Sequence, residues 1–271
     1  MRLGFFTLGC PDWTLEQIAR AAAEMGYDGV ELRVAGDGNH FSLDRTAEQR
    51  QALRALFANA GTRVFSIGGY TNFAMPDDAQ RARNIETLKA EVALAQDLGA
   101  AFIRSHVGKI AKDETRAGIL DRTARALADC AKVAEKANIH IGLETHDDWC
   151  NGSDLKMLID KVNSPHVGTV FDICNSATGG TEPIKKSFEA LKGCIKYCHV
   201  KDAAKRPDGK WTSVPPGTGQ VPLREVIRMV RASGFDGFLS FEHEKKWEPH
   251  LPPPEEAFPH YIRVMRQILS A

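Results

Sequence analysis

The sequence predicts a single α/β domain over residues 1–271, folded as a (β/α)8 barrel, or TIM barrel. Short apolar runs alternate eight times with segments of helical periodicity along the whole chain. The apolar runs have no polar alternating face, which is typical of parallel strands that are covered on both sides. The length of 271 residues also suits one such barrel, which needs roughly 250 residues.

The first strand–helix unit shows clear start and stop residues. The apolar run RLGFFTL (2–8) predicts a strand, and a helix is expected over 14–26. Thr14 is the expected N-cap, Gln17 completes a capping box, and Gly26 suits the left-handed residue that ends a helix. An open, doubly wound sheet would need a phosphate-type glycine loop after this strand, and TLGCPDW is not one. The closed barrel is therefore favoured.

The other seven units repeat this order of strand and helix. Eight strand–helix units in series favour parallel strands that close into a barrel. The expected strands lie at 28–34, 62–68, 100–106, 138–146, 166–173, 194–200 and 235–244, and the expected helices at 46–60, 77–98, 113–136, 153–162, 182–192, 222–234 and 254–269.

The last four strands each end in a side chain of a metal-binding type: Glu144, Asp172, His199 and Glu242. Side chains alternate along a strand, so when the three carboxylates point into the barrel, their apolar neighbours face the helices. The C-terminal ends of barrel strands carry the chemistry in enzymes of this fold. Three carboxylates in a semi-dry pocket repel one another unless a cation neutralises them. We therefore expect these four residues, called the quartet below, to converge on one divalent ion, Mn²⁺ first, with Mg²⁺, Co²⁺ or Zn²⁺ as alternatives.

Two histidines and two residues of the second strand are candidate substrate contacts. His106 ends the fourth strand beside Glu144 and suits a hydrogen bond to a substrate hydroxyl. His146 suits either that role or a hydrogen bond to a metal ligand. Glu31 and Arg33 end the second strand, either as substrate contacts or as an ion pair across the barrel mouth.

The residues after His199 are further candidates. Lys201 suits the stabilisation of an oxyanion and Asp202 the orientation of a ligand, although both also fit charges on a solvated loop. The glycines of PPGTGQ (215–220) suit an ordinary turn better than a phosphate cradle, so no phosphorylated substrate is predicted.

All four tryptophans follow the C-terminal ends of strands. Aromatic faces pack against the C–H faces of sugars and exclude water. The alternative is that these side chains pack the loops or form a contact between subunits. The four residues are Trp13, Trp149, Trp211 and Trp247.

The sequence resembles the xylose isomerase-like TIM-barrel superfamily, also called the sugar phosphate isomerase/epimerase or AP endonuclease 2 family. The resemblance covers nearly the whole chain and rests on MGYDGVEL (25–32), IGLETH (141–146), VFDICN (170–175), CHVKD (198–202) and GFDGFLSFE (234–242). It implies that the quartet is the metal site and that Glu144 and Glu242 also move protons. The implied activity is a metal-dependent isomerase or epimerase of a keto sugar or small hydroxy-ketone, which acts through α-proton removal and a metal-stabilised enediolate.

Three alternatives remain at this stage. A metal-dependent lyase of the same family, such as an inosose or dehydroshikimate dehydratase, would begin with the same proton removal. Its general acid would be His106 or Lys201. An AP endonuclease is disfavoured, because Asn175 stands where the DNA-cleaving relatives carry a histidine. A barrel that binds a sugar without turnover is disfavoured by the intact quartet.

The bulk composition narrows the class of partner. Acidic and basic residues balance at 35 each, which argues against a nucleic-acid partner. No apolar run approaches the roughly 20 residues of a membrane span. The six cysteines form no CxxC pair, and we find no signal peptide, so we expect reduced thiols and a cytoplasmic location. The expected partner is a sugar or a polyol-derived ketone, and a homo-oligomer, dimer or tetramer, is compatible with these features.

Overall fold

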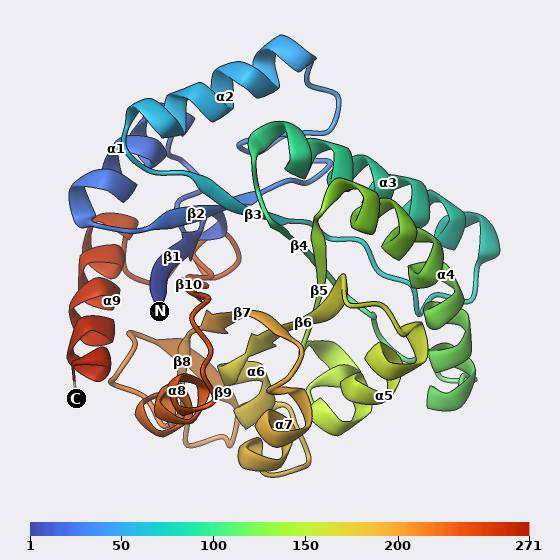
Figure 1. The fold of residues 1–271 in the computed structure, drawn as a ribbon. Coiled ribbons are helices and arrows are strands. Elements are labelled where there is room, and N and C mark those ends of the chain that lie inside the picture. The colour runs from blue at the N-terminus through green and yellow to red at the C-terminus, as the bar shows by residue number, and fades with distance from the viewer. Residues whose placement is uncertain (271) are drawn as a thin grey trace.

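The computed structural model describes residues 1–270, which form the predicted closed (β/α)8 barrel (Figure 1). Eight parallel strands close the barrel in the order β1-β10-β7-β6-β5-β4-β3-β2. The strands are β1 (Arg2–Phe6), β2 (Gly29–Arg33), β3 (Val64–Gly68), β4 (Phe102–Ser105), β5 (His140–Glu144), β6 (Val167–Asp172), β7 (Ile195–Val200) and β10 (Phe238–Phe241).

Every predicted helix is present, and no helix end differs from its prediction by more than three residues. The expected capping box of Thr14 and Gln17 forms, and Gly26 is left-handed with a φ of 77°. Among residues 1–270, no helix has both the length and the apolar character that crossing a membrane requires. The predicted helices are α1 (Leu15–Met25), α2 (Ala47–Asn59), α3 (Asp78–Leu98), α4 (Arg116–Ala137), α5 (Gly152–Val162), α7 (Ile184–Leu191), α8 (Leu223–Ala232) and α9 (Pro254–Leu269).

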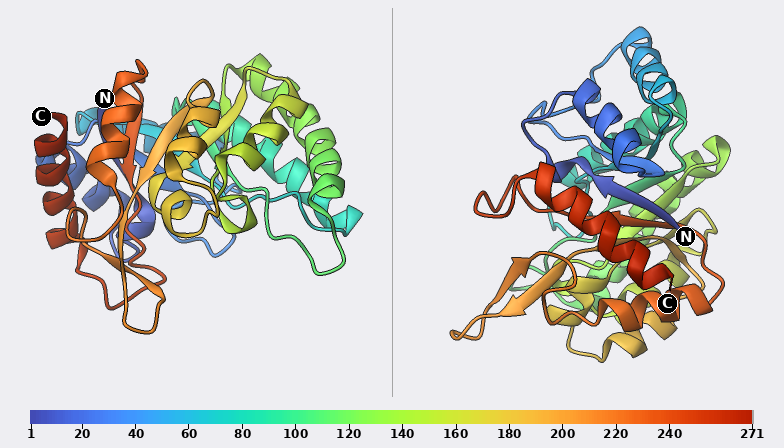
Figure 2. Two further views of the ribbon diagram at one scale, coloured as in Figure 1. Left: turned by 90° about the horizontal axis from the view of Figure 1, so that it is seen from below. Right: turned by 90° about the vertical axis from the view of Figure 1, so that its left-hand side faces the viewer.

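Several short elements were not predicted. Helix α6 (Ile173–Thr178) follows β6 directly, and strands β8 (Asp202–Lys205) and β9 (Trp211–Val214) form an antiparallel hairpin. Two 3-10 turns, η1 (Thr7–Gly9) and η2 (Asp147–Trp149), follow β1 and β5. In Figure 2 the hairpin projects from the end of the barrel opposite the N-terminus. These additions therefore lie after strand ends, where the sequence places its candidate site.

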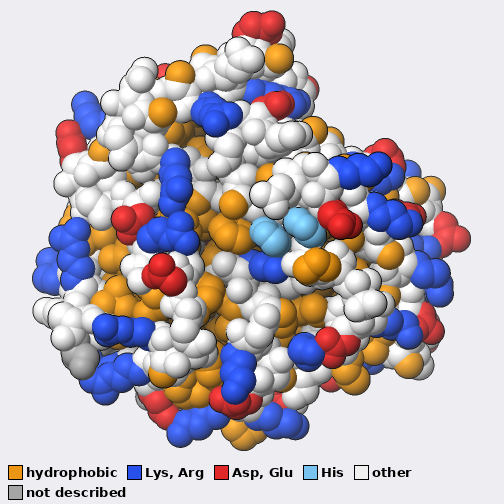
Figure 3. Space-filling model, in the orientation of Figure 1, with side chains coloured by type: hydrophobic (Ala, Val, Ile, Leu, Met, Phe, Trp, Pro, Cys, Tyr) orange, Lys and Arg blue, Asp and Glu red, His pale blue; other side chains and the backbone are white. Residues whose placement is uncertain are grey.

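The barrel interior is apolar toward the N-terminal ends of the strands. Phe65, Val170, Tyr197 and Phe238 fill this part, and the rings of Phe65 and Phe238 stack with centroids 3.8 Å apart. Gly4 makes room for them, since a Cβ there would lie 2.7 Å from the Phe65 ring. Figure 3 views this end, where apolar side chains show between the charged ones. Polar side chains occupy the other end of the interior.

Candidate metal centre

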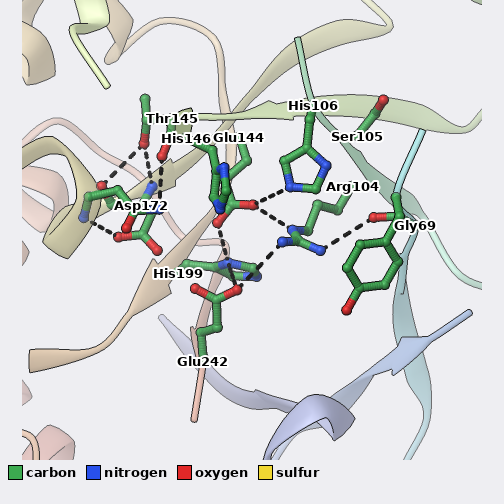
Figure 4. A network of polar contacts seen from close by, with 12 residues as sticks. Gly69, Arg104, Ser105, His106, Glu144, Thr145, His146, Asp172, His199 and Glu242 are labelled. Carbon is green, nitrogen blue, oxygen red and sulfur yellow. Dashed lines mark hydrogen bonds and ion pairs between the residues drawn. The ribbon is translucent and has the colours of Figure 1, made fainter. Parts of the chain in front are cut away.

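The quartet converges as predicted. The ligand-type atoms of its four members all lie within 4.8 Å of one another. Glu144 and Asp172 are the last residues of β5 and β6, His199 lies in β7, and Glu242 follows β10. The first three side chains are fully buried and Glu242 is 3% exposed. Figure 4 shows Glu144, His199 and Glu242 pointing toward one another from different strands.

Two cationic side chains partly neutralise the quartet. Arg104 in β4 places its Nε 2.6 Å from Glu144 Oε2 and its Nη2 3.6 Å from Glu242 Oε1. Lys201 Nζ lies 2.5 Å from Glu242 Oε2, 3.1 Å from Asp172 Oδ2 and 2.8 Å from Glu244 Oε1. Arg104 had no predicted role, although it shares the inward-facing parity of His106. Lys201 is buried among carboxylates, so the alternative of a solvated loop charge is wrong.

The carboxylates respond to burial and to these cations in different ways. Burial alone would raise the pKa of Glu144, but Arg104 and His199 hold that pKa well below its usual range. Burial raises the pKa of Asp172 to about 7, against the opposing effect of Lys201, and the Glu242 and Glu144 carboxylates add to the rise. Asp172 is thus the least compensated carboxylate of the quartet.

The donor set fits a divalent ion. Asp172 Oδ2 is buried and accepts no hydrogen bond, because Lys201 Nζ is close to it but is not aligned to donate one. Three carboxylates and one imidazole are donors that Mn²⁺, Mg²⁺, Co²⁺ and Zn²⁺ accept in proteins. A cation among them would supply the positive counter-charge that the Asp172 carboxylate lacks.

The imidazole of His199 is held at both ring nitrogens. Its Nδ1 faces the quartet, 3.0 Å from Glu144 Oε1 and 3.5 Å from Glu242 Oε1. Its Nε2 lies 2.7 Å from Glu31 Oε2, on the side away from the quartet. Burial disfavours the imidazolium, but the surrounding carboxylates, led by Glu31, outweigh burial and raise the pKa of His199 well above its usual range.

Glu31 and Arg33 do not form the ion pair that was the alternative to substrate contacts. Glu31 is fully buried inside the barrel and accepts hydrogen bonds from Tyr197 Oη at 2.7 Å and Ser240 Oγ at 2.9 Å. Arg33 lies one level higher and pairs with Asp37 at 2.8 Å. Both side chains point inward, but the two-residue rise between them puts Glu31 beneath the quartet. Glu31 therefore cannot contact a substrate in this arrangement.

Asp202 was expected to orient a ligand of the quartet, but its carboxylate binds backbone amides of a loop instead. Its Oδ1 accepts the backbone N–H of Ala203 and Val221, and its Oδ2 accepts those of Gly217 and Gly219 at 2.8 and 2.9 Å. Asp202 thus organises the loop PPGTGQ from below. The loop amides that a phosphate would need are already satisfied by this carboxylate, in keeping with the prediction of a turn.

His106 and His146 lie beside the quartet, where the sequence placed them. His106 Nε2 is 3.1 Å from Glu144 Oε2, and the two imidazole rings are 4.9 Å apart. Burial, together with Arg104, lowers the pKa of His106 to about 4, so this ring is neutral at pH 7. Both rings line a hollow of about 270 Å³, called the polar hollow below, whose other residues are Tyr70, Asn72, Gly108, Lys109 and Asp147.

A second group of ligand-type atoms also meets at Glu144. Atoms of His106, Glu144 and His146 lie within 4.8 Å of one another. The guanidinium of Arg104 is bound to Glu144 Oε2 on this side, and its positive charge opposes a second cation. The quartet is therefore the better ion site.

The tryptophans have different environments. Trp149 is fully buried and donates its Nε1–H to Gly108 O at 2.9 Å, so the prediction that it contacts a sugar is wrong and it packs the loop instead. Trp13 packs edge-on against Phe258. Trp211 and Trp247 are 38% and 54% exposed. Trp247 lies 5.6 Å from the Arg33 guanidinium, close to the barrel mouth.

Known proteins resemble this chain in sequence and in structure over most of its length. A family model described as a xylose isomerase-like TIM barrel matches residues 19–268. Fructoselysine 3-epimerase of Shigella flexneri is 27% identical over 258 residues, which cover 89% of this chain and 90% of the relative. L-ribulose-5-phosphate 3-epimerase of Salmonella paratyphi A is 29% identical over 248 residues, which cover 87% and 84%. A solved structure of the IolI protein with a bound zinc atom has a TM-score of 0.83 at 18% identity, over 100% of this chain and 98% of that one.

Proposed function

The chain belongs to the xylose isomerase-like TIM-barrel family, and from this premise we propose that it is a metal-dependent epimerase or isomerase of a keto sugar. The observation that carries the proposal is the quartet, in which two glutamates meet from strands β5 and β10, which β6 and β7 separate. The two relatives above are named as 3-epimerases, which favours epimerisation next to a ketone.

Glu144, Asp172, Glu242 and the Nδ1 of His199 would hold one divalent ion, for which we propose Mn²⁺ first and Mg²⁺, Co²⁺ or Zn²⁺ as alternatives. The bound ion would act as a Lewis acid that polarises the substrate carbonyl and stabilises the developing enediolate. Lys201, which contacts Asp172, Glu242 and Glu244, would remain beside these carboxylates when the ion is bound.

The two glutamates carry the protons. One removes the proton from the carbon next to the carbonyl, and the other returns a proton to the opposite face, which inverts that carbon. Arg104 and His199 favour the ionised form of Glu144, and Lys201 does the same for Glu242, whose pKa is also held well below its usual range against the effect of burial. The glutamate that faces the α-proton therefore accepts it as a carboxylate, and the other glutamate must take up a proton from solvent before it returns one to the opposite face.

The polar hollow suits the hydroxyl-bearing part of the substrate. His106 and His146 offer ring nitrogens, and Tyr70 and Lys109 add a hydroxyl and an ammonium group. A dehydratase would need an acid above the leaving hydroxyl. Lys201, one of the two candidates for that acid, is engaged with three carboxylates, so epimerisation ranks above dehydration.

We also propose a cytoplasmic enzyme whose partner is a sugar or a polyol-derived ketone rather than a nucleic acid or a membrane. All six cysteines are free, in keeping with a reducing compartment. The balanced charge offers no general attraction for a polyanion.

The test is α-proton exchange in D2O. Protein loaded with Mn²⁺ would be incubated with ketoses, inososes and hydroxy-ketones, and each α-proton followed by proton NMR. We expect exchange that requires the metal and falls by about 10²–10⁴-fold in Glu144→Gln or Glu242→Gln. Glu91→Gln, a buried carboxylate on α3 outside the quartet, is the matched control and should keep the exchange. Exchange that survives metal removal or either quartet substitution would contradict the proposal.

A further inference from the structure

An apolar cavity of about 350 Å³ adjoins the quartet on the side of β7 and β10. Glu242 and Lys201 form its inner edge, so the cavity reaches a member of the quartet directly. The polar hollow lies on a different side of the barrel, at the ends of β3, β4 and β5. A substrate held at the quartet therefore has two unlike spaces available to its two ends.

The cavity walls come from segments that are far apart in the chain. Beyond its charged inner edge, most of the area that these walls expose to the cavity is apolar, although Glu244, Glu256 and Arg263 also line it. The apolar residues are Val214 at the end of β9, Pro216 just after it, Phe241 at the end of β10, Leu251 in the following loop and Ala257 in α9.

Hydrogen bonds between the walls hold the cavity open without a ligand. His260 Nε2 of α9 lies 2.8 Å from Pro216 O, which ties the helix to the loop after the hairpin. Ser213 Oγ donates to Glu248 Oε1 at 2.6 Å, which ties the hairpin to the loop after β10. Since the walls are fixed to one another, a ligand would enter with little rearrangement, and preformed sites bind more tightly for that reason.

An unsubstituted ketose matches this cavity poorly. It carries a hydroxyl on nearly every carbon, and a hydroxyl buried without a hydrogen-bond partner costs about 1–3 kcal/mol in proteins. An apolar group placed there gains roughly 25 cal/mol for each Å² removed from water. The volume lies near the lower end of the roughly 300–1,000 Å³ of small-molecule sites, which suits part of a ligand rather than a whole one.

On the basis of the proposed function, we propose that the apolar cavity binds an apolar substituent of the substrate. The preferred substrate is then a ketose that carries an alkyl chain or an aromatic ring. Its hydroxyl-bearing carbons occupy the polar hollow, its carbonyl region lies at the quartet, and its substituent extends past Glu242 into the cavity.

The test compares a 2-ketohexose with the same ketose bearing a hexyl or a benzyl group, on the Mn²⁺-loaded enzyme. We expect kcat/KM to be at least about 10-fold higher for a substituted ketose, since one or two well-buried apolar groups contribute that much. The variant Ala257→Leu narrows the cavity, and the ratio of the two kcat/KM values should fall toward one. Val214→Phe narrows it from the opposite wall and replaces Ala257→Leu if that variant does not fold.

The matched control is Ala58→Leu, an added side chain in an exposed hollow on α2 that is remote from the barrel end. It should keep the wild-type ratio. Calorimetric binding of the substituted ketose to the metal-loaded wild type and to Ala257→Leu gives a readout that needs no turnover, with an expected affinity loss of about 10-fold. Equal kcat/KM and equal affinity for plain and substituted ketoses would overturn the subsite. Binding to the cavity without proton exchange would overturn the proposed function instead.

Discussion

At the scale of single residues, the orientation of His199 depends on a carboxylate that is not one of the four quartet residues. Glu31 accepts the Nε2–H of His199, and Tyr197 and Ser240 hold Glu31 in place. A neutral histidine that donates from one ring nitrogen presents the other as a lone pair, and a bound metal requires this neutral form. Glu31 therefore fixes the tautomer in which Nδ1 is free to bind a cation, and it also raises the basicity of the ligand.

Replacing Glu31 by Gln should weaken metal binding. The amide keeps the size of the side chain but removes its charge and places N–H donors beside Tyr197 and Ser240. Loss of such a supporting carboxylate typically costs about 10–100-fold in metal affinity. Titration of metal-free protein with Mn²⁺ in a calorimeter measures the effect. Glu91→Gln removes a buried carboxylate outside this network and should leave the affinity unchanged. An unaltered Kd in Glu31→Gln would show that His199 needs no such partner.

We expect Glu91 to make the stability of the fold depend on pH. This α3 side chain is 2% exposed, its Oε2 accepts no hydrogen bond, and burial raises its pKa to about 8 despite the opposing charge of Arg104. The folded pKa is above the unfolded one, so the protonated form contributes stability that is complete below about pH 4.5 and is lost as the pH rises through about 8.

The variant Glu91→Gln should therefore gain stability over the wild type as the pH rises from 5 to 8. The gain approaches about 1.4 kcal/mol for each pH unit in this interval, because only the wild type must take up a proton on folding or carry an ionised carboxylate in its core. Urea unfolding at pH 5, 6.5 and 8 measures it. A difference between the two proteins that does not vary with pH would show that Glu91 is ionised in the native state throughout.

At the scale of elements, Asp202 connects β8 to the loop that leads into α8. Its two oxygens accept four backbone N–H groups, among them those of Gly217 and Gly219. In Asp202→Asn, one oxygen becomes an NH2 group that faces N–H donors. An unsatisfied buried donor costs about 1–3 kcal/mol, so we expect a loss of that size in the free energy of unfolding.

The loss should be local as well as global. Hydrogen exchange at the amides of Gly217 and Gly219 should become faster in Asp202→Asn, because these groups lose their acceptor. Asp208→Asn, at the exposed tip of the hairpin, is the matched control and should change neither quantity. Unchanged exchange at both glycines would mean that the loop keeps its form without the carboxylate.

Periodicity along the chain predicted the elements that are long enough to show it. The six residues of α6 cover fewer than two turns, and the helix begins because Asp172 Oδ1 accepts the N–H of Asn175 at 2.7 Å. The quartet was predictable because each member ends a strand. The contacts of Arg104 and Glu31 with it were not, since they depend on which inward side chains of different strands lie at the same height in the barrel. Trp149 was misassigned because its burial depends on how two loops pack.

At the scale of the whole molecule, the barrel encloses an excess of negative charge at one end. Four buried carboxylates, Glu31, Glu144, Asp172 and Glu242, face two buried cations, Arg104 and Lys201. When His199 is neutral, as a metal ligand must be, two negative charges remain uncompensated. The apolar layer of Phe65 and Phe238 beneath them admits no counter-charge. One divalent cation would offset this excess, so ion binding should stabilise the whole barrel.

Saturating Mn²⁺ should therefore raise the thermal midpoint of the protein above that of the metal-free form. A ligand that binds only the native state at 1,000 times its Kd contributes about 4 kcal/mol, which corresponds to a rise on the order of 10 °C for a chain of this size. Scanning calorimetry with Mn²⁺ and with EDTA measures the difference. Asp172→Asn removes one ligand and one uncompensated charge, so its metal-free midpoint should equal or exceed that of the wild type, while its response to Mn²⁺ should be small. An equal response in both proteins would place the ion outside the quartet, and no response in the wild type would mean that Arg104 and Lys201 already compensate the buried charge.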